Sequence, residues 1–368
     1  MSTTIKRWLL GIALCFAGGH IYAQIHWKNP LNEAVNVMQG IAMPGAARQP
    51  FARLPDALKA TVRTPVWNLG QQSAGEYIEF TSNASKISVR YQVQGALQMP
   101  HMPATGVSGV DLYVHNGKGQ WEWAPGRYSF KDTVNYTFDH LADQRGTIFR
   151  LYLPLYNGVK WLEIGVEPGK SLSFLRPSDE RPVVIYGTSI AQGGCASRPG
   201  LAWPSVLGRK LNVPVINLAF SGNGRLEEPI INLMNTVDAR IFVLDCMPNL
   251  ADKTLYPEEE LRKRITAAVS LLKEKHPQTP ILLVGHSGGA DPHVLDARRM
   301  EEFRSTSAIL IKVFKELQAK GVAGIYHLSS AEIGMNIEST VDGVHPNDIG
   351  MMEHANAFAK KIREIGMP

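Results

Sequence analysis

The hydrophobic pattern of this chain changes once, across a short polar segment, and the change limits the folds available to it. Apolar and polar residues alternate from about Phe51 to Leu175, whereas short, wholly apolar runs alternate with helical segments after Pro182. The segment between them, residues 176–182, is polar and holds two prolines, as linkers do. A chain of 368 residues can bury two cores, so we expect two domains, at 24–176 and 182–368.

The first domain is predicted to be an antiparallel β-sandwich, similar to a jelly roll. Period-two alternation is typical of half-buried strands, and it recurs at 87–93, 110–114, 149–153 and 162–166. Asn116–Gly119 is rich in residues that accept a positive φ, which favours a hairpin turn after the second of these strands. No segment here shows a convincing helical period, so strands and turns should make up the domain.

The second domain is predicted to be a flavodoxin-like, three-layer α/β/α fold around a five-stranded parallel sheet. Its apolar runs have the length of buried strands and are separated by helical segments, of which Pro257–His276 is the clearest. Right-handed crossovers then cover both faces of the sheet. The runs are 183–186, 215–218, 241–244, 281–284 and 324–327. In such folds the site lies at the carboxyl ends of the strands.

The first 23 residues are predicted to be a secretory signal peptide. Lys6 and Arg7 precede an apolar run from Trp8 to Ala17, and Ala23 offers a small residue for cleavage before Gln24. The run is too short to anchor a mature protein in a membrane, and a lipoprotein reading through Cys15 is the weaker alternative, because Leu14 precedes that cysteine. A secreted or periplasmic protein without a membrane anchor is expected.

Charge and cysteine content exclude several classes of protein. The signal segment supplies two of the five net positive charges, and no block of like charge follows it, which argues against nucleic acid as a partner. Cys195 and Cys246 are too few for a disulfide scaffold, and they are either bonded to each other or two buried thiols. No metal-binding motif is present, so neither a metal nor another cofactor is expected.

Groups suited to acyl transfer follow the predicted strands of the second domain. Ser189 comes after the first strand, Gly222 after the second and Asn249 after the third, while Asp342 and His345 lie near the C-terminus. A serine hydroxyl needs a base such as histidine, and a carboxylate fixes the tautomer of that base. Backbone and side-chain amides can stabilise charge that develops on a carbonyl oxygen.

These blocks resemble the SGNH hydrolases, also called GDSL-type esterases. Gly187–Ser189 stands at the GDS motif, Gly222 and Asn249 at the second and third blocks, and Asp342–His345 at the D-x-x-H block. The sandwich is similar to the extra domain of secreted bacterial two-domain members. The resemblance implies Ser189 as nucleophile, His345 as base and Asp342 as its orienting acid. It also implies an oxyanion hole formed by the backbone N–H groups of Ser189 and Gly222 and by the Asn249 side-chain amide.

The chain departs from the family pattern in two blocks. Thr188 replaces the Asp of the GDS motif, which is not the nucleophile. In the third block Met247 replaces Gly and Leu250 replaces Asp, so the resemblance is weakest around Asn249.

A second serine motif competes with the first. Gly285–Gly289 matches the G-x-S-x-G nucleophile elbow and follows a predicted strand, but Pro292 interrupts the helix that an elbow requires. Ser189 is therefore preferred to Ser287. His286 and His293 leave the same strand end and are expected to line the cleft, with His286 contacting substrate. His101, in the loop Met99–Gly109, is expected to reach over the cleft from the sandwich.

The sequence thus predicts a secreted serine esterase that hydrolyses carboxylic esters through an acyl-enzyme. By analogy with the secreted two-domain relatives, the substrate is a small-molecule or glycan ester, with a short acyl group such as acetyl on a carbohydrate. Two alternatives stay open. One is an acyl hydrolase of lipase or thioesterase type, and the other is a carbohydrate-binding protein with an inactive hydrolase domain.

Overall fold

Two antiparallel sheets form the N-terminal half of the protein. The computed structural model describes residues 24–141, 147–288 and 297–366. One sheet has the order β1 (His26–Lys28), β10 (Val159–Val166), β4 (Ile87–Val93), β8 (Val134–Phe138) and β7 (Arg127–Ser129). The other has the order β11 (Leu172–Phe174), β3 (Tyr77–Ser82), β9 (Ile148–Tyr152), β5 (Asp111–His115) and β6 (Trp121–Ala124), with β2 (Met38–Gln39) also on β3.

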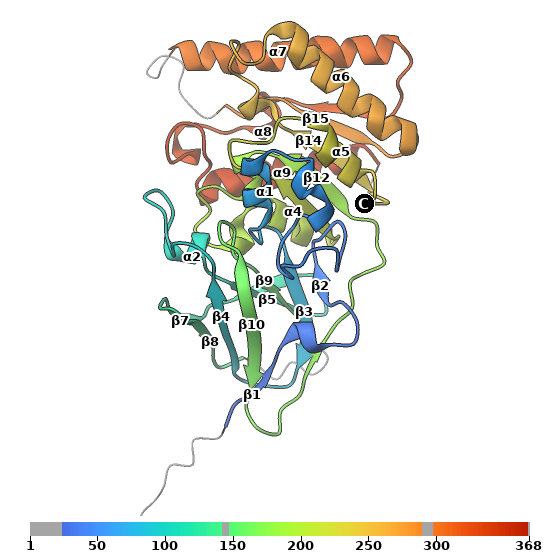
Figure 1. Ribbon diagram of the computed structural model, residues 1–368. Helices are drawn as coiled ribbons and strands as arrows, with labels where there is room; N and C mark the ends of the chain where they lie inside the picture. The colour runs from blue at the N-terminus through green and yellow to red at the C-terminus, as the bar shows by residue number, and fades with distance from the viewer. Residues whose placement is uncertain (1–23, 142–146, 289–296, 367–368) are drawn as a thin grey trace, which may run out of the picture.

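The two sheets pack face to face as a sandwich, which is the lower half of Figure 1. Alternate residues of β4 and β10, such as Val89 and Ile164, meet Phe80 and Phe149 of β3 and β9 in one core. The rings of Phe80 and Phe149 are stacked with centroids 5.4 Å apart. The alternation in the sequence was therefore a correct indication of strands buried on one face, and the predicted sandwich is confirmed.

The prediction that the N-terminal half contains no helix is wrong. The structure has α1 (Thr64–Gly70) and α2 (Ala104–Val107), with the 3₁₀ turns η1 (Pro30–Asn32) and η2 (Asp56–Ala60). α1 has Pro65 in its first turn, and its buried residues are Val66 and Gly70. Two buried positions give no readable helical period, and α1 is stabilised by packing on the other half of the protein.

A parallel sheet forms the C-terminal half, in the order β13 (Val215–Ala219), β12 (Val183–Gly187), β14 (Ile241–Asp245), β15 (Ile281–Val284) and β16 (Ile325–Leu328). Each strand matches a predicted run to within a residue or two, and the order has the first strand between the second and third, as in flavodoxin. The predicted fold class is confirmed. Because the sheet is parallel, the residues after each strand meet at one edge.

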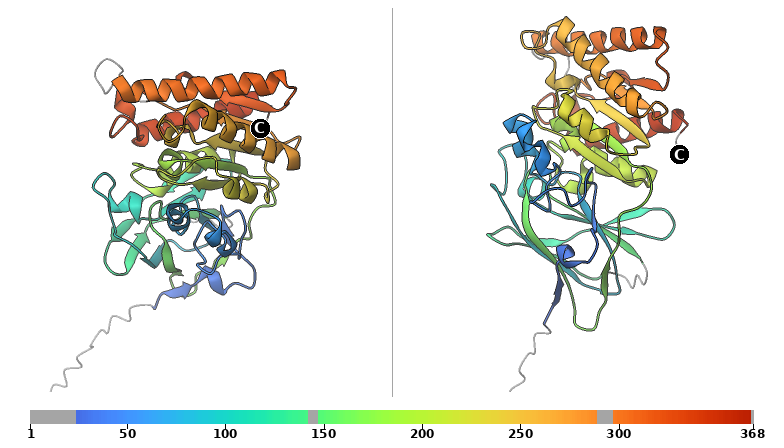
Figure 2. Two further views of the ribbon diagram at one scale, coloured as in Figure 1. Left: turned by 45° about the horizontal axis from the view of Figure 1, so that its top comes forward. Right: turned by 45° about the vertical axis from the view of Figure 1, so that its right-hand side comes forward.

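Helices cover both faces of this sheet (Figures 1 and 2). Val184 and Tyr186 of β12 face one core and Val183 and Ile185 face the other, as the alternation of a strand requires. The first face carries α5 (Glu228–Met234), α6 (Glu258–Lys275) and α7 (Ala297–Ala319). The second carries α3 (Ser189–Gln192), α4 (Trp203–Leu211), α8 (Ser330–Ile333) and α9 (Asp348–Glu364). The 3₁₀ turns in this half are η3 (Pro199–Leu201), η4 (Met247–Asn249) and η5 (Ile337–Ser339).

The sandwich contributes side chains to both cores of the parallel-sheet half. Leu54 and Val66 pack on the first face, and Met102 and Tyr156 are part of the core on the second. Residues 175–182, between β11 and β12, form neither helix nor strand. The two halves are thus joined by one covalent connection and by an apolar interface on either side of β12.

Glu76, at this interface, makes stability depend on pH. The residue is buried, and neither carboxylate oxygen has a hydrogen-bond partner among the described residues. Burial raises the pKa of Glu76 to about 8, although the nearby Arg53 lowers it. The folded protein therefore holds a proton that the unfolded chain releases near pH 4.5. Between pH 4.5 and about pH 8, Glu76 therefore lowers the free energy of unfolding by about 1.4 kcal/mol for each unit by which the pH rises.

We therefore expect the stability of Glu76→Gln, relative to wild type, to increase as the pH rises from 5 to 8.5. Glutamine keeps the size of the side chain and does not titrate, and the other titrating groups are common to both proteins. Urea denaturation at both pH values measures the difference. An equal difference at pH 5 and pH 8.5 would show that Glu76 is not protonated in the folded protein.

Candidate active site

Ser189 is the first residue of α3, directly beyond the carboxyl end of the central strand β12. Its Oγ lies 2.8 Å from Nε2 of His345, which is 156 residues later in the chain. The tight turn depends on Gly187, where a Cβ atom would lie 2.6 Å from Cβ of Ala191. The structure thus brings together the serine and the histidine that the sequence singled out.

Asp342 and His345 share a tight loop in front of α9. His345 Nδ1 donates to Oδ2 of Asp342 at 2.7 Å, and Oδ1 accepts the backbone N–H groups of Val344 and His345. Gly343, with φ of +83°, allows the chain to turn between them. With its Nδ1 proton on Asp342, the imidazole presents Nε2 as an acceptor for the Ser189 hydroxyl proton.

The carboxylate of Asp342 keeps its charge in this loop. Partial burial would raise the pKa of Asp342, but the hydrogen bonds donated by the backbone and ring of His345 outweigh it and lower the pKa. The loop is held in turn by α9, because Asn347 accepts the N–H groups of Ile349 and Gly350 as its N-cap. A charged, fixed Asp342 can stabilise an imidazolium on His345.

Two of the three groups are partly exposed, and the serine is buried beneath them. Ser189 is 8% exposed, whereas the side chains of His345 and Asp342 are 28% and 51% exposed. The side chains of the histidine and its carboxylate can therefore be reached from outside the protein.

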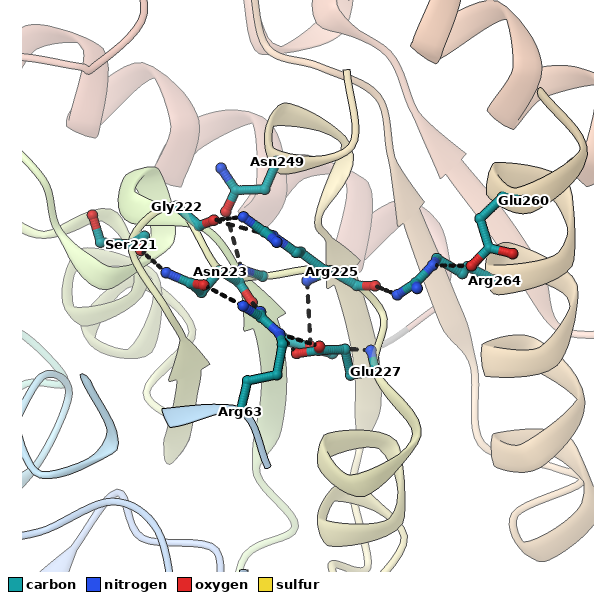
Figure 3. Close-up of polar contacts among 11 residues, drawn as sticks. Arg63, Ser221, Gly222, Asn223, Arg225, Glu227, Asn249, Glu260 and Arg264 are labelled. Atoms are coloured by element: carbon teal, nitrogen blue, oxygen red, sulfur yellow. Dashed lines mark hydrogen bonds and ion pairs between the residues drawn. The ribbon is translucent and has the colours of Figure 1, made fainter. Parts of the chain in front are cut away.

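The three predicted oxyanion donors are available. Asn249, in η4, accepts the Gly224 N–H on Oδ1 at 3.0 Å, which leaves its side-chain NH₂ group as a donor. Figure 3 shows its side chain beside Gly222, with the carbonyl oxygen turned toward the loop. The N–H groups of Ser189 and Gly222 have no acceptor among the described residues. The arrangement suits an oxyanion hole, and these roles stay predictions.

Sequence reasoning missed the contacts that the sandwich makes at this site. The Tyr156 hydroxyl donates to the carbonyl oxygen of Ser189 at 3.3 Å. Gln192, in the helix that Ser189 begins, donates to Oε1 of Gln72 at 2.6 Å and accepts the Ser221 N–H at 2.9 Å. Pairs so far apart in the chain leave no periodic signal, so no pattern in the sequence could reveal them.

Asp111 links the sandwich to the loop that follows α3. This buried carboxylate accepts the Gly200 N–H at 3.0 Å, Nη1 of Arg198 at 2.5 Å and Nε1 of Trp123 at 2.6 Å. In the same loop Ser197 donates twice to Asp348, the first residue of α9, so the contact extends to the helix behind His345. A buried carboxylate with donors from both halves fixes their relative position.

The competing serine motif lies in a different environment. Ser287 is buried, and its hydroxyl has no partner within the described ranges. His286 is 2% exposed, with its ring stacked on Phe303 at 3.5 Å between centroids. Burial, with a smaller effect of His354, lowers the pKa of His286 to about 3, so its ring is neutral. The expected substrate contact of His286 has no support here, because its ring lies in the interior.

The roles expected for the other two histidines, His101 and His293, stay predictions. His101 is exposed, beside Met102, which packs in the same core as Ile190, the residue after Ser189. His293 lies outside the described residues, as does the predicted signal segment, residues 1–23.

Both cysteines are free and buried, so the second of the two expectations for them is confirmed. Burial, followed by the nearby Asp342, raises the pKa of Cys195 to about 11, and burial also raises the pKa of Cys246. Neither thiol is disposed to act as a nucleophile, because the thiolate is the reactive form.

Within residues 24–141, 147–288 and 297–366, no cluster of three or more His, Cys, Asp or Glu side chains could hold a metal ion. In those same ranges, every helix is too short or too polar to cross a lipid bilayer.

Two family models match the chain in succession. Residues 180–363 match the GDSL-like lipase/acylhydrolase family, and residues 25–172 match the GxDLY model, an N-terminal domain of SGNH-hydrolase-type esterases. The letters of the second name occur here as Gly109–Tyr113, whose Asp111 makes the contacts described above. Among curated proteins, no significant match is found.

Solved structures of similar fold cover nearly the whole chain. A GDSL-like lipase from Bacteroides ovatus is 30% identical, with a TM-score of 0.83 over 93% of this chain and 98% of the other. A salicylyl-acyltransferase, SsfX3, of a tetracycline biosynthetic pathway is 20% identical, with a TM-score of 0.73 over the same shares. An acetyl xylan esterase from Butyrivibrio proteoclasticus is 12% identical, with a TM-score of 0.57 over 93% and 100%. At these identities the last two show a shared fold.

Proposed function

The chain belongs to the GDSL-like lipase/acylhydrolase family and is a carboxylic ester hydrolase, and on this premise we propose that it removes short acyl groups, acetyl above all, from carbohydrate outside the cytoplasm. The observation that carries the proposal is the contact of Ser189 Oγ with Nε2 of a histidine whose Nδ1 is held by Asp342. This is the geometry of an activated serine nucleophile.

In the proposed reaction Ser189 Oγ attacks the ester carbonyl carbon while its proton passes to Nε2 of His345. The carbonyl oxygen becomes an oxyanion that accepts hydrogen bonds from the Ser189 and Gly222 N–H groups and from Asn249. His345 then gives the proton to the departing alcohol, which leaves the acyl group on Ser189. Water, deprotonated by His345, attacks this acyl-enzyme, and the acid leaves as the Ser189 hydroxyl is restored.

A short acyl group on a glycan is supported by two observations. The side chains of His345 and Asp342 are partly exposed, so the leaving alcohol can belong to a large molecule. One protein of this fold is an acetyl xylan esterase. Export rests on the first 23 residues, with their cationic start, apolar run and Ala23 before Gln24.

The acyl preference is tested with p-nitrophenyl esters from acetate to palmitate and with acetylated xylo-oligosaccharides. We expect kcat/KM to be highest for acetate and to fall by at least about tenfold at octanoate, because each misfitted methylene costs transition-state binding. Acetate release from the oligosaccharides should accompany this preference.

The control is Ser189→Ala, assayed beside wild type on every ester. A rate that stays level or rises toward palmitate would replace the carbohydrate proposal with a lipase. Equal rates for wild type and Ser189→Ala would refute the serine mechanism, and an inactive wild type that binds the oligosaccharides would indicate a binding protein.

A further inference from the structure

The loop Ser221–Glu227, between β13 and α5, carries the proposed oxyanion donor Gly222. The carbonyl group of Ser221 and the N–H group of Gly222 belong to one peptide unit, which is planar and trans. The two groups therefore point to opposite sides of that unit. Whatever holds the Ser221 oxygen also decides where the Gly222 N–H is directed.

Asn223 holds the Ser221 oxygen. Its Nδ2 donates to that oxygen at 2.9 Å, and its own N–H donates to the carbonyl oxygen of Phe220 at 2.8 Å. Gly222 itself offers no steric restraint, because a Cβ atom at that position would meet nothing within 4 Å. The orientation of the Ser221–Gly222 peptide consequently depends on the side-chain amide of Asn223.

Arg63 holds that amide from the other half of the protein (Figure 3). The residue is the N-cap of α1, and its Nη1 donates to Oδ1 of Asn223 at 2.8 Å. A guanidinium group can only donate hydrogen bonds, so Oδ1 must face Arg63 and Nδ2 must face the Ser221 oxygen. Arg63 thereby excludes the flipped amide, which would set two acceptors against each other.

Glu227 holds Arg63 in place. Its two carboxylate oxygens accept Nε of Arg63 at 2.5 Å and Nη2 at 3.1 Å, a bidentate pair. The pair also neutralises the charge of Arg63, whose pKa is raised above its ordinary value by its hydrogen bond with Glu227. Arg63 thus acts on the loop as a fixed set of donors rather than as a free charge.

We propose that Arg63 is a positioning residue of the oxyanion hole, holding the Gly222 N–H toward the substrate carbonyl oxygen through Asn223. The inference rests on the proposed serine esterase mechanism. It gives α1, and with it the N-terminal half, a part in the chemical step. Arg63 does not touch the reacting atoms, and its effect appears where charge develops on the carbonyl oxygen.

Two variants separate this role from a mere contact between the halves. Asn223→Asp strengthens the bond to Arg63 by adding a charge but removes the donor to the Ser221 oxygen. Arg63→Met removes all the donors to Asn223 and Glu227. The matched control is Arg90→Met, which removes a similarly exposed sandwich arginine from its pair with Glu163.

With p-nitrophenyl acetate we expect kcat to fall roughly 10- to 100-fold in Asn223→Asp and in Arg63→Met, with little change in KM. The affinity for an alkylboronic acid, whose boron binds Ser189 Oγ and places an oxygen in the hole, should fall in parallel. Asn223→Asp should keep the melting temperature of wild type, and Arg90→Met should keep its kcat.

The inference is overturned if Asn223→Asp has wild-type kcat and boronate affinity, or if Arg63→Met changes KM or melting temperature alone. Failure of this inference can be distinguished from failure of the proposed serine esterase mechanism. If wild type is active and Ser189→Ala is inactive while both loop variants behave as wild type, only the positioning role falls. If Ser189→Ala equals wild type, both fall.

Discussion

Ser189→Ala and His345→Ala are each expected to lower kcat for p-nitrophenyl acetate on the order of 10⁴- to 10⁶-fold, and the double variant should be no slower than the slower single variant. The hydroxyl and the imidazole are 2.8 Å apart and act in one proton transfer, so that the loss of either removes the step. Losses that multiply in the double variant would show that the two groups act independently.

Asp342→Asn extends this test to the orientation of the imidazole. The asparagine Oδ1 can still accept the backbone N–H groups of Val344 and His345, so that the loop should survive. Its NH₂ group would, however, face Nδ1, and the imidazole would then carry its proton on Nε2, where it cannot accept one from Ser189. We expect a loss of up to about 10⁴-fold in kcat with an unchanged fold.

Ser287→Ala is the matched control for the serine. This serine belongs to the second motif and is buried, and its hydroxyl lacks a partner among the residues described. We expect kcat within a few-fold of wild type. The reverse result, with Ser287→Ala inactive and Ser189→Ala active, would assign the chemistry to the strand end of β15. Steady-state kinetics at protein concentrations determined by absorbance measures all five variants.

Arg53→Met is expected to destabilise the protein by about 3–5 kcal/mol and to lower its melting temperature on the order of 10 °C. Arg53 is 1% exposed and donates to four carbonyl oxygens. Those of Leu69 and Gln72 lie in the N-terminal half, and those of Asn217 and Ala219 lie on β13. Because β13 is an edge strand, no neighbouring strand supplies N–H groups to these last two carbonyl groups.

The expected loss of stability in Arg53→Met has two sources. Four carbonyl groups, those of Asn217 and Ala219 fully buried, lose a charged donor, and the carboxyl group of Glu76 loses the nearby cation that favours its ionised form. The double variant Arg53→Met/Glu76→Leu should therefore regain part of the lost stability at pH 8.5. Thermal and urea denaturation measure both variants.

Arg262→Met is the control for this experiment. Arg262 pairs with Glu316 between two surface helices, so its removal should leave the transition midpoint unchanged. If Arg53→Met melts within about 2 °C of wild type, Arg53 does not secure the edge of β13.

Much of the fold was readable from the sequence because burial imposes local periods. The five apolar runs became β12 to β16 because both faces of a parallel sheet are covered. The helix predicted at Pro257–His276 is α6, Glu258–Lys275. The helices α1 and α2 were not predicted, because they are too short to show a helical period. They are stabilised by the surfaces on which they pack.

The sequence indicated those residues of the candidate site that follow the ends of strands. Ser189, Gly222 and Asn249 each lie within four residues of the end of a strand of the parallel sheet, and Asp342 reaches His345 within one turn of chain. His286 also follows a strand, but its ring turned inward onto Phe303. Position after a strand indicates the region of a residue, and the packing around it decides which way its side chain points.

By itself the sequence determined the two folds, their order and the chemical groups of the candidate site, because periodicity and short motifs are local properties of a chain. How the two halves meet, in contrast, depends on contacts that exist in the folded protein alone. Arg63 lies 160 residues from Asn223, and Arg53 lies 164 residues from Asn217. Such contacts follow from the docking of two separately patterned surfaces, and their distances, burial and charge exist only once both surfaces are in place.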